Sequence, residues 1–243
     1  MILRRGIASV IALVLASAAI ADEAAVRRMM ETKLAAVGRV ESVARMPGAG
    51  LFEVIIRGAD GPRIYYVDER ASVLVIGQAF DARSGRNLTE EHMRKLSAIR
   101  WDVLPFQWAI TDRRGNGRRK IAIFSDPNCP YCKRFEEDLA KLDDITVHIF
   151  PYAVIKPESV RQAKAVWCSK DRVKAWNDLM FRRIEPAAAP DCDTPVEKLV
   201  EYGRGVGANS TPTWFLESGE RYSGAMPLEQ VRALLDAAAA TKR

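Results

Sequence analysis

Two cysteines separated by two residues follow directly on a predicted β-strand. Cys129 and Cys132 come after the apolar run 121–124 and open a predicted helix over about residues 131–142. This order of strand, C-x-x-C and helix is typical of a redox motif. The free N–H groups and the positive dipole end at a helix N-terminus stabilise a thiolate, which lowers its pKa. We therefore predict Cys129 as the exposed, low-pKa nucleophile. Cys132 is then the shielded thiol that resolves a mixed disulfide formed at Cys129.

Other interpretations of the cysteine pattern have less support. A zinc ribbon would need a second C-x-x-C, whereas Cys168 and Cys192 are far apart in sequence. A purely structural bridge across two intervening residues is strained. If Cys129 pairs with Cys132, the other two cysteines are left for each other. A static bridge there would contribute about 3 kcal/mol, and the alternative is a second redox pair that relays electrons.

Residues 1–21 have the pattern of a secretory signal peptide. Arg4 and Arg5 precede an uncharged apolar run over 7–16, and small residues end the segment at 17–21. A transmembrane anchor would need about 20 apolar residues, and this run is shorter. We expect cleavage after Ala21, which would place the mature chain in an oxidising compartment where disulfides persist.

Charge and histidine content exclude several other functions. The formal net charge of +6 includes Arg4 and Arg5, so the mature chain keeps a surplus of +4. That surplus is too small to indicate a nucleic-acid partner. The chain has two histidines, His92 and His148, which are far apart in sequence. This argues against a histidine-rich metal site and against a Ser-His-Asp arrangement.

Periodicity divides the mature chain into two parts. An amphipathic helix over 24–37 comes first, and short β-rich runs separated by turn-forming residues follow. The predicted strands are 40–46, 51–57, 63–68 and 72–76. Residues 22–85 thus form a helix and a meander whose small core favours a partner. A helix with Asn87 or Thr89 as its N-cap follows, within a linker over 86–100.

Residues 101–243 alternate strands and helices, which indicates an α/β unit with a mixed sheet. Strand-like runs over 101–111 and 120–125 flank a basic turn over 113–119, which we interpret as a solvated hairpin loop. The other predicted elements are a strand over 145–150, helices over 158–184 and 194–206, strands over 213–217 and 221–222, and a helix over 228–240.

Three segments are similar to the periplasmic disulfide isomerases of the DsbC/DsbG family. They are Phe124-Ser125-Asp126-Pro127-Asn128-Cys129-Pro130-Tyr131-Cys132-Lys133, Gly207-Ala208-Asn209-Ser210-Thr211-Pro212-Thr213, and Gly77-Gln78-Ala79-Phe80-Asp81 followed by Asn87-Leu88-Thr89. The resemblance extends over essentially the whole mature chain. It implies a cystatin-like dimerisation domain over 22–85, a linker helix over 86–100, and a thioredoxin-fold catalytic domain with a helical insertion over 101–243.

The resemblance also implies a function and a set of site residues. Cys129 and Cys132 would isomerise or reduce non-native disulfides in misoxidised or unfolded exported proteins, and Cys168 and Cys192 would form a structural disulfide. The substrate-binding residues that it implies are Pro130, Tyr131, Thr211 and Pro212, with Pro212 in a cis peptide bond. Two chains would form a homodimer around a shared cleft. A membrane reductase of the DsbD type would keep the pair reduced, and no metal or organic cofactor would be needed.

The residues between the two cysteines depart from the isomerase branch of that family. This branch typically carries Gly-Tyr, whereas Pro130-Tyr131 resembles the DsbG branch. Two alternatives therefore stay open. The first alternative is a DsbG-like reductase of sulfenylated single cysteines. The second is a dimeric, chaperone-like binding module.

Overall fold

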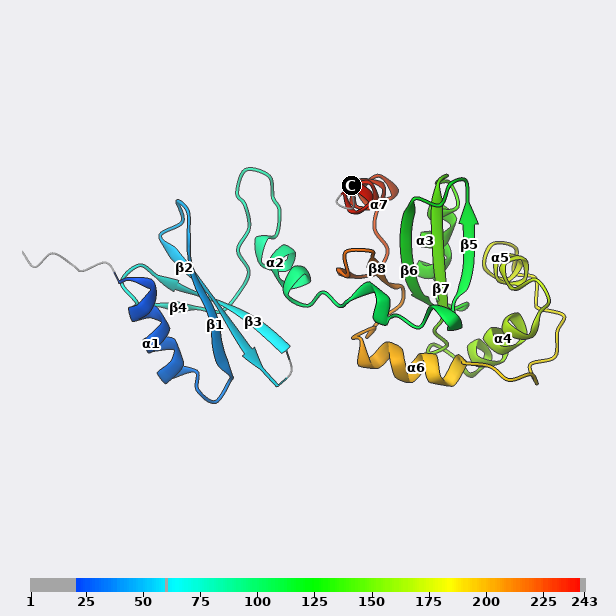
Figure 1. Ribbon diagram of the computed structural model, residues 1–243, viewed down its shortest axis with the longest axis horizontal. Coiled ribbons are helices and arrows are strands. Elements are labelled where there is room, and N and C mark those ends of the chain that lie inside the picture. Colours follow the sequence, from blue (N-terminus) through cyan, green and yellow to red (C-terminus); the bar gives the residue numbers. More distant parts are fainter. Residues whose placement is uncertain (1–20, 60, 241–243) are drawn as a thin grey trace, which may run out of the picture. The chain divides into compact units, whose positions relative to one another are not determined.

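The computed structural model describes residues 21–59 and 61–240, which divide into two compact units between Met93 and Arg94 (Figure 1). The predicted signal peptide, apart from its last residue, lies outside the described residues. Each unit has its own sheet and its own apolar core. Within the two described ranges, no helix is both long and apolar enough to cross a membrane.

The N-terminal unit is a four-stranded antiparallel sheet, in the order β1-β2-β3-β4, covered by a helix. Its elements are α1 (Glu23–Lys33), β1 (Arg39–Met46), β2 (Leu51–Gly58), β3 (Gly61–Asp68), β4 (Leu74–Val75) and α2 (Leu88–Leu96). Val26 and Met30 of α1 are completely buried against the sheet, where they meet Phe52 of β2. This arrangement confirms the predicted helix and meander.

Helix α1 ends at Lys33, earlier than the predicted Val37. The backbone leaves the helical region at Leu34. The chain then passes so close to β2 that a Cβ at Gly38 would lie 2.4 Å from the Arg57 carbonyl oxygen. A glycine is needed at this approach.

Asn87 is the N-cap of α2, because its side-chain oxygen accepts a hydrogen bond from the Glu90 N–H at 3.0 Å. Thr89, the other candidate, has a different role. Its buried hydroxyl accepts a hydrogen bond from the Ala79 N–H at 2.7 Å and bonds to the Tyr66 hydroxyl at 2.5 Å. The first turn of α2 is thereby attached to β3.

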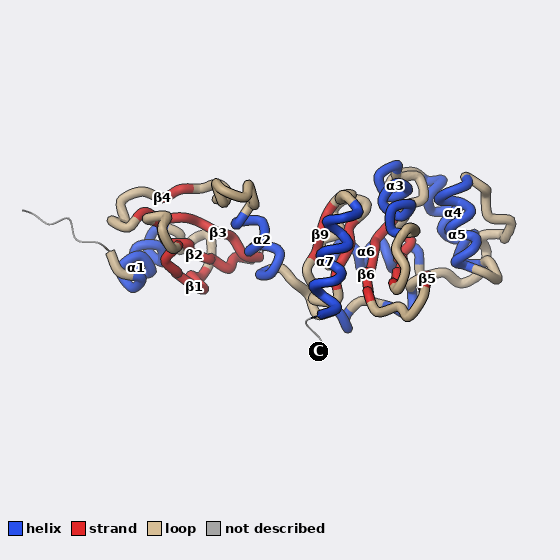
Figure 2. Tube along the Cα trace, turned by 90° about the horizontal axis from the view of Figure 1, so that it is seen from above, coloured by secondary structure: helices blue, strands red, loops and turns tan. Residues whose placement is uncertain are grey.

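The C-terminal unit contains a five-stranded mixed sheet in the order β5-β7-β6-β8-β9. Figure 2 draws its strands in red, with β5, β6 and β9 labelled. Strands β6 and β7 run parallel, and the other neighbours run antiparallel. Its elements are the 3-10 turns Trp101–Val103 and Phe106–Trp108, β5 (Ile110–Arg114), β6 (Arg119–Ser125), α3 (Pro130–Leu139), β7 (Ile145–Pro151), α4 (Pro157–Cys168), α5 (Arg172–Arg182), α6 (Val196–Gly205), β8 (Thr213–Leu216), β9 (Arg221–Ser223) and α7 (Leu228–Ala240). The predicted class, α/β with a mixed sheet, is confirmed.

Strand β6 is buried on both faces and leads into the cysteine-bearing turn. Successive side chains of a strand point to opposite faces. Ile121 and Ile123 accordingly pack with residues of α3, α5 and α7, whereas Ala122 and Phe124 pack with residues of α6 and the 3-10 turns. All four are 0% exposed, so the end of β6 is a fixed platform for the segment that follows.

The predicted strand over 101–109 is wrong. These residues form the two 3-10 turns, and β5 begins only at Ile110. Pro105 lies between the turns and has no N–H to give to a strand ladder. The apolar character of this segment has another cause, because Leu104 is buried in the core on the α6 side of the sheet.

The basic turn over 113–119 is not a hairpin loop, because β7 lies between β5 and β6 in the sheet. The turn is instead attached to the beginning of β7. The Asp144 carboxylate accepts a hydrogen bond from the Asn116 N–H at 2.9 Å, and the Thr146 hydroxyl donates to the Gly117 carbonyl oxygen at 3.0 Å. Gly117 has a φ of +67°, a backbone region that suits glycine.

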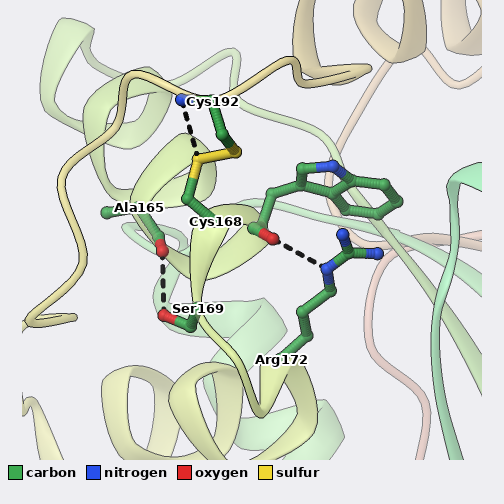
Figure 3. Close-up of a disulfide and its surroundings, with 6 residues drawn as sticks. Ala165, Cys168, Ser169, Arg172 and Cys192 are labelled. Atoms are coloured by element: carbon green, nitrogen blue, oxygen red, sulfur yellow. Dashed lines mark hydrogen bonds between the residues drawn. A yellow bond between two sulfur atoms is a disulfide. The ribbon is translucent and has the colours of Figure 1, made fainter.

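A disulfide joins Cys168, the last residue of α4, to Cys192 in the loop between α5 and α6 (Figure 3). The two Cα atoms are 5.8 Å apart, and the Cys192 N–H points to the Cys168 Sγ at 3.3 Å. Beside the bridge, the Arg172 guanidinium lies 3.8 Å from the centre of the Trp167 ring and donates to the Trp167 carbonyl oxygen. The bridge therefore holds the long loop after α5 against the end of α4.

Candidate active site

Cys129 and Cys132 lie at the beginning of α3, where the sequence predicts them. Cys129 is the N-cap residue of α3 and has extended backbone. Pro130 is the first helical residue, where a backbone N–H would have no partner within the helix. The Cys129 sulfur lies 3.4 Å from the Thr211 carbonyl oxygen, to which it donates a hydrogen bond when its thiol is protonated. The Thr211–Pro212 peptide bond is cis. The structure thus brings the two cysteines together with the Thr-Pro segment, which is distant in sequence.

The site lowers the pKa of Cys129 from 9.0 to about 5. The largest cause is a hydrogen bond from the Cys132 thiol, which stabilises the Cys129 thiolate. Hydrogen bonding from the Thr211 side chain and from the N–H groups of Cys132 and Tyr131 acts in the same direction, and burial opposes it. Cys129 is therefore ionised at neutral pH when the pair is reduced.

Cys132 has the opposite character. Burial is the largest cause that raises the pKa of its thiol, and the hydrogen bond that it gives to Cys129 adds to the rise. The Asp126 backbone and the Ser125 side chain oppose this shift. Because a thiolate is the reactive form of cysteine, the pair combines one ready nucleophile with one protonated thiol.

The predicted exposure of Cys129 is wrong, although the difference in acidity has the expected sign. Cys129 is 3% exposed and Cys132 is 0% exposed. The segment that contains Thr211 lies against the Cys129 sulfur, which explains why so little of it reaches the surface. Tyr131, in contrast, is 66% exposed. It lines a groove of about 300 Å³ with Arg134, Asp138, Ala225, Met226 and Pro227.

The turn before Cys129 is fixed by Asp126, a residue that sequence reasoning missed. Asp126 is 0% exposed, and its carboxylate accepts hydrogen bonds from four groups. The donors are the Asn128 N–H at 2.7 Å, the Val154 N–H at 2.8 Å, the Ile155 N–H at 2.9 Å and the Ser159 hydroxyl at 2.8 Å. The bond to Asn128 forms a local Asx turn, for which the Asp-Pro-Asn order was the available signal.

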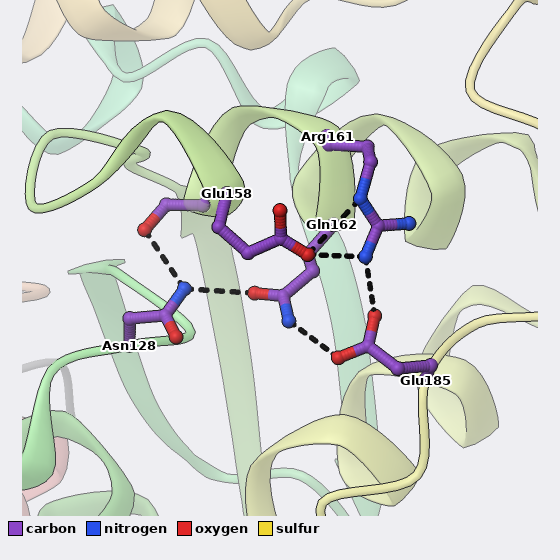
Figure 4. Close-up of polar contacts among 6 residues, drawn as sticks. Asn128, Glu158, Arg161, Gln162 and Glu185 are labelled. Carbon is purple, nitrogen blue, oxygen red and sulfur yellow. Dashed lines mark hydrogen bonds and ion pairs between the residues drawn. The ribbon is translucent and has the colours of Figure 1, made fainter.

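Asn128 extends this anchoring toward the helical insertion (Figure 4). Its amide donates to the Ser159 hydroxyl at 3.0 Å and to the Gln162 side-chain oxygen at 2.8 Å. Gln162 donates in turn to Glu185 at 2.6 Å, and Glu185 pairs with Arg161 at 2.8 Å. The residue before the nucleophile is thereby linked to α4 and to the loop after α5.

Glu136 is a second acidic residue that sequence reasoning missed. It lies one turn after Cys132 on the buried face of α3 and is 4% exposed. Its carboxylate accepts a hydrogen bond from the Ser125 hydroxyl at 2.5 Å and one from the Trp176 indole N–H at 2.7 Å. Burial raises the pKa of Glu136 from 4.5 to about 7, against the effect of these two donors. An acid at a helical position that should be apolar was the only signal in the sequence.

In the described parts of the chain, no group of three or more His, Cys, Asp or Glu side chains could hold a metal ion. The chemistry that the site supports is that of its sulfur atoms. A strongly acidic thiol beside a protonated one, at the start of a helix that follows the central strand, defines a thiol–disulfide oxidoreductase of the thioredoxin fold.

The comparisons with known proteins agree with this class. A thioredoxin-like domain matches residues 106–239, and the disulfide bond isomerase N-terminal domain matches residues 17–90. The chain belongs to the family of DsbC-type thiol:disulfide interchange proteins.

Individual relatives give the extent of the similarity. The probable DsbC of Bordetella parapertussis is 39% identical over 196 residues, which cover 81% of this chain and 68% of the relative. The DsbC of Escherichia coli K12 is 24% identical over 225 residues, which cover 89% of this chain and 88% of the relative. The crystal structure of a disulfide interchange protein from Neisseria gonorrhoeae is 37% identical, with a TM-score of 0.54 over 56% of this chain and 99% of that one.

Proposed function

We propose that this protein is exported to the periplasm and isomerises non-native disulfides in folding proteins. The observation that carries the proposal is that the site lowers the pKa of Cys129 and raises the pKa of Cys132. An isomerase needs a stable thiolate as its nucleophile and a resolving thiol that stays protonated. The signal-like segment over 1–21 and the matched isomerase N-terminal domain support the compartment and the substrate class.

The reaction begins when the Cys129 thiolate attacks one sulfur of a substrate disulfide. A bond forms between Cys129 and that sulfur, the substrate disulfide breaks, and the second substrate sulfur leaves as a thiolate. Another thiolate of the same substrate then attacks the mixed disulfide. The corrected pairing forms, and Cys129 returns as a thiolate. No net oxidation occurs in this cycle, so the pair must remain reduced, which is the role we assign to a membrane reductase of the DsbD type.

We assign substrate binding to Pro130, Tyr131, Thr211 and Pro212. The short approach of the Thr211 carbonyl oxygen to Cys129 supports this role, because a peptide lying along residues 211–212 would bring its cystine to the nucleophile. The exposed Tyr131 ring and the groove beside it would contact the flanking residues of a partly unfolded chain.

We also propose that the N-terminal unit forms a homodimer through the β4 edge of its sheet. Strand β4 is the last strand of the sheet, and apolar side chains on it and in the segments next to it are exposed. They are Val73 (54%), Leu74 (37%), Val75 (43%), Ile76 (75%) and Phe80 (58%). An open sheet edge with an apolar surface is a site for pairing with another chain. In this proposal residues 22–85 dimerise, residues 86–100 link the two domains, and residues 101–243 carry the chemistry.

Refolding of scrambled ribonuclease by the full-length protein tests the function. The reduced protein should restore ribonuclease activity catalytically, and Cys129→Ser should abolish this effect. A parallel assay on a protein with one sulfenylated cysteine distinguishes the reductase alternative. Faster turnover there than on scrambled ribonuclease, or full refolding activity of Cys129→Ser, would contradict the isomerase assignment.

A further inference from the structure

The segment that approaches Cys129 belongs to neither a helix nor a strand. Residues 206–212 lead from the end of α6 to the beginning of β8 (Figure 1). At the downstream end of this segment, Thr213 pairs with Phe124 of β6, which fixes where the segment ends. The position of Thr211 next to the nucleophile therefore also depends on the contacts that hold the upstream end.

The side chain of Tyr152 holds this upstream end. Its hydroxyl donates a hydrogen bond to the Ala208 carbonyl oxygen at 2.9 Å, and the two residues are only 2% and 1% exposed. Burial raises the pKa of Tyr152 above its ordinary value of 10.0, so the hydroxyl keeps its proton at neutral pH and remains a donor. Ala208 precedes Thr211 by three positions, so this hydrogen bond lies close in the chain to the contact with Cys129.

The backbone of Tyr152 is attached to the strand that leads to the nucleophile. Tyr152 directly follows β7, and its N–H donates to the Ser125 carbonyl oxygen at 2.8 Å. Ser125 is the last residue of β6 and comes immediately before the cysteine-bearing turn. Tyr152 is therefore bonded to both sides of the site, through its backbone to the strand before Cys129 and through its side chain to the segment that contains Thr211.

Packing fixes the direction in which the Tyr152 hydroxyl points. The ring of Phe124 meets the Tyr152 ring in a T-shaped arrangement, with the ring centroids 5.5 Å apart. On α6, a Cβ at Gly203 would lie 2.4 Å from Cε2 of Tyr152, so α6 approaches the ring where a side chain would clash. The Gly203 carbonyl oxygen also accepts a hydrogen bond from the Ala208 N–H at 2.8 Å. The Tyr152 ring and the start of the segment are thus held together.

We infer that Tyr152 is a positioning residue for substrate binding, because its hydroxyl, bonded to the Ala208 carbonyl oxygen, sets the approach of residues 211–212 to Cys129. The inference rests on the proposed function, in which a substrate peptide lies along these two residues. The side chain of Tyr152 is buried, so it acts on a bound peptide only through the segment. Main-chain contacts of the peptide depend on where the segment lies, whereas a small disulfide needs only the sulfur of Cys129.

Two disulfides of different size test this inference. One is a peptide that carries a fluorophore and a quencher on opposite sides of its disulfide, and the other is a small aromatic disulfide whose thiolate is coloured. Tyr152→Phe keeps the ring and removes the hydroxyl. At pH 7 its second-order rate with the peptide should fall by about fivefold or more, because small misplacements of a binding group are costly, while its rate with the small disulfide should stay within about twofold of the wild type.

The acidity of Cys129 gives a second measurement that a general loss of stability would not change. Thr211 is one of the groups that lower the pKa of Cys129, so a displaced segment should raise this pKa above about 5. Thiolate absorbance of reduced Tyr152→Phe, followed against pH, should show the rise. The thiol should still be mostly ionised at pH 7, which is why the small disulfide should keep its rate.

Matched variants separate positioning from stability. Tyr202→Phe also removes a hydroxyl that donates to a backbone carbonyl oxygen, in this case that of Val103 at 2.6 Å. This variant should keep both rates and the pKa of Cys129. Gly203→Ala keeps the Tyr152 hydroxyl but forces the ring to move, so it should lose the peptide rate selectively. Urea unfolding shows whether each variant is folded under the conditions of the assay.

The outcomes are distinguishable. A folded Tyr152→Phe protein that keeps the wild-type rate with the peptide would overturn the inference, as would equal slowing with both disulfides or the same selective loss in Tyr202→Phe. If Tyr152→Phe does not fold, Gly203→Ala decides between the same outcomes. A wild-type protein that cleaves both disulfides but does not refold scrambled ribonuclease would instead contradict the isomerase assignment alone.

Discussion

The sulfur of Cys129 lies 3.4 Å from the carbonyl oxygen of Thr211, although 82 residues separate them in sequence. Cys129 follows β6, and Thr211 precedes β8, the neighbouring antiparallel strand. Phe124 faces Thr213 across these strands. The register of β6 and β8 therefore sets the approach of the substrate-binding segment to the nucleophile, and a shift of this register would separate them.

Replacing Cys132 should make Cys129 less acidic. Cys132→Ala removes the thiol hydrogen bond that is the largest cause of the lowered pKa of Cys129, so this pKa should rise by about one unit or more from about 5. Thiolate absorbance of the reduced protein, followed against pH, measures the change. In the Cys129→Ala protein, the remaining Cys132 thiol should stay protonated up to pH 9. Ionisation of Cys132 below that pH would reverse the assignment of the two roles.

The reduced protein should gain stability as pH rises. The pKa of Cys129 is lower in the folded chain than its ordinary value of 9.0, so the unfolded chain binds more protons between pH 5 and 9. The stabilising contribution is therefore complete above about pH 9 and is lost as pH falls through about 5. Urea unfolding of the reduced wild type and of Cys129→Ala should show a difference of a few kcal/mol that shrinks over this range. A difference that is independent of pH would contradict the lowered pKa.

Removing the Asp126 carboxylate should destabilise the C-terminal unit strongly. Asp126→Ala leaves four donors without their acceptor, three of them backbone N–H groups, and should cost about 3–5 kcal/mol. Asp126→Asn keeps one acceptor oxygen and should cost less. Urea unfolding measures both, with the exposed Asp191→Ala as the control that should change little. Equal stability of Asp126→Ala and Asp191→Ala would show that the anchoring is unimportant.

The bridge between Cys168 and Cys192 should act as a static brace. Its loss in the double alanine variant should lower the free energy of unfolding by about 3 kcal/mol, on the loop-entropy estimate for a separation of 24 residues. Titration with dithiothreitol should reduce the Cys129–Cys132 disulfide well before this one. If both bonds open at similar potentials, the relay of electrons between two redox pairs becomes the better explanation.

A charge at the β4 edge should separate the proposed dimer. Ile76→Glu places a carboxylate in the exposed apolar row after β4, where its burial between two chains would be costly. Sedimentation should show a dimer for the wild type and a monomer for this variant. Val103→Glu, at an exposed apolar position of the other unit, is the control and should remain dimeric. A monomeric wild type, or a dimeric Ile76→Glu, would contradict the assigned interface.

Local patterns in the sequence were enough to predict most helices and strands and the position of the cysteine pair. Helix α7 begins and ends where the periodicity predicts, at Leu228 and Ala240. The pattern failed where a later segment decides the structure. The runs before and after the turn at 113–119 look like a hairpin, and only the insertion of β7 between them shows otherwise.

The same limit applies to the site. Cys129 and Cys132 are recognisable because their spacing and their place before a helix carry the chemistry. Asp126 and Glu136 are not, because a sequence pattern does not distinguish a buried acid from a solvated one. Their partners come from distant positions, such as Val154 for Asp126 and Trp176 for Glu136. Burial of either carboxylate without such donors would be unfavourable, and nothing in the neighbouring sequence shows that the donors are present.

The position of β7 between β5 and β6 has a consequence for the order of events during synthesis. Strands β5 and β6 leave the ribosome together, joined by a short turn, before the residues of β7 exist. Any hairpin they form at that time must open again to admit β7, and the other edge of β6 stays vacant until β8 at residues 213–216 has emerged. Non-local pairings of this kind are slow steps. Cys129 is therefore synthesised long before β8, the strand that completes its surroundings. Until β8 has paired with β6, the reactive thiol is present without its folded active site.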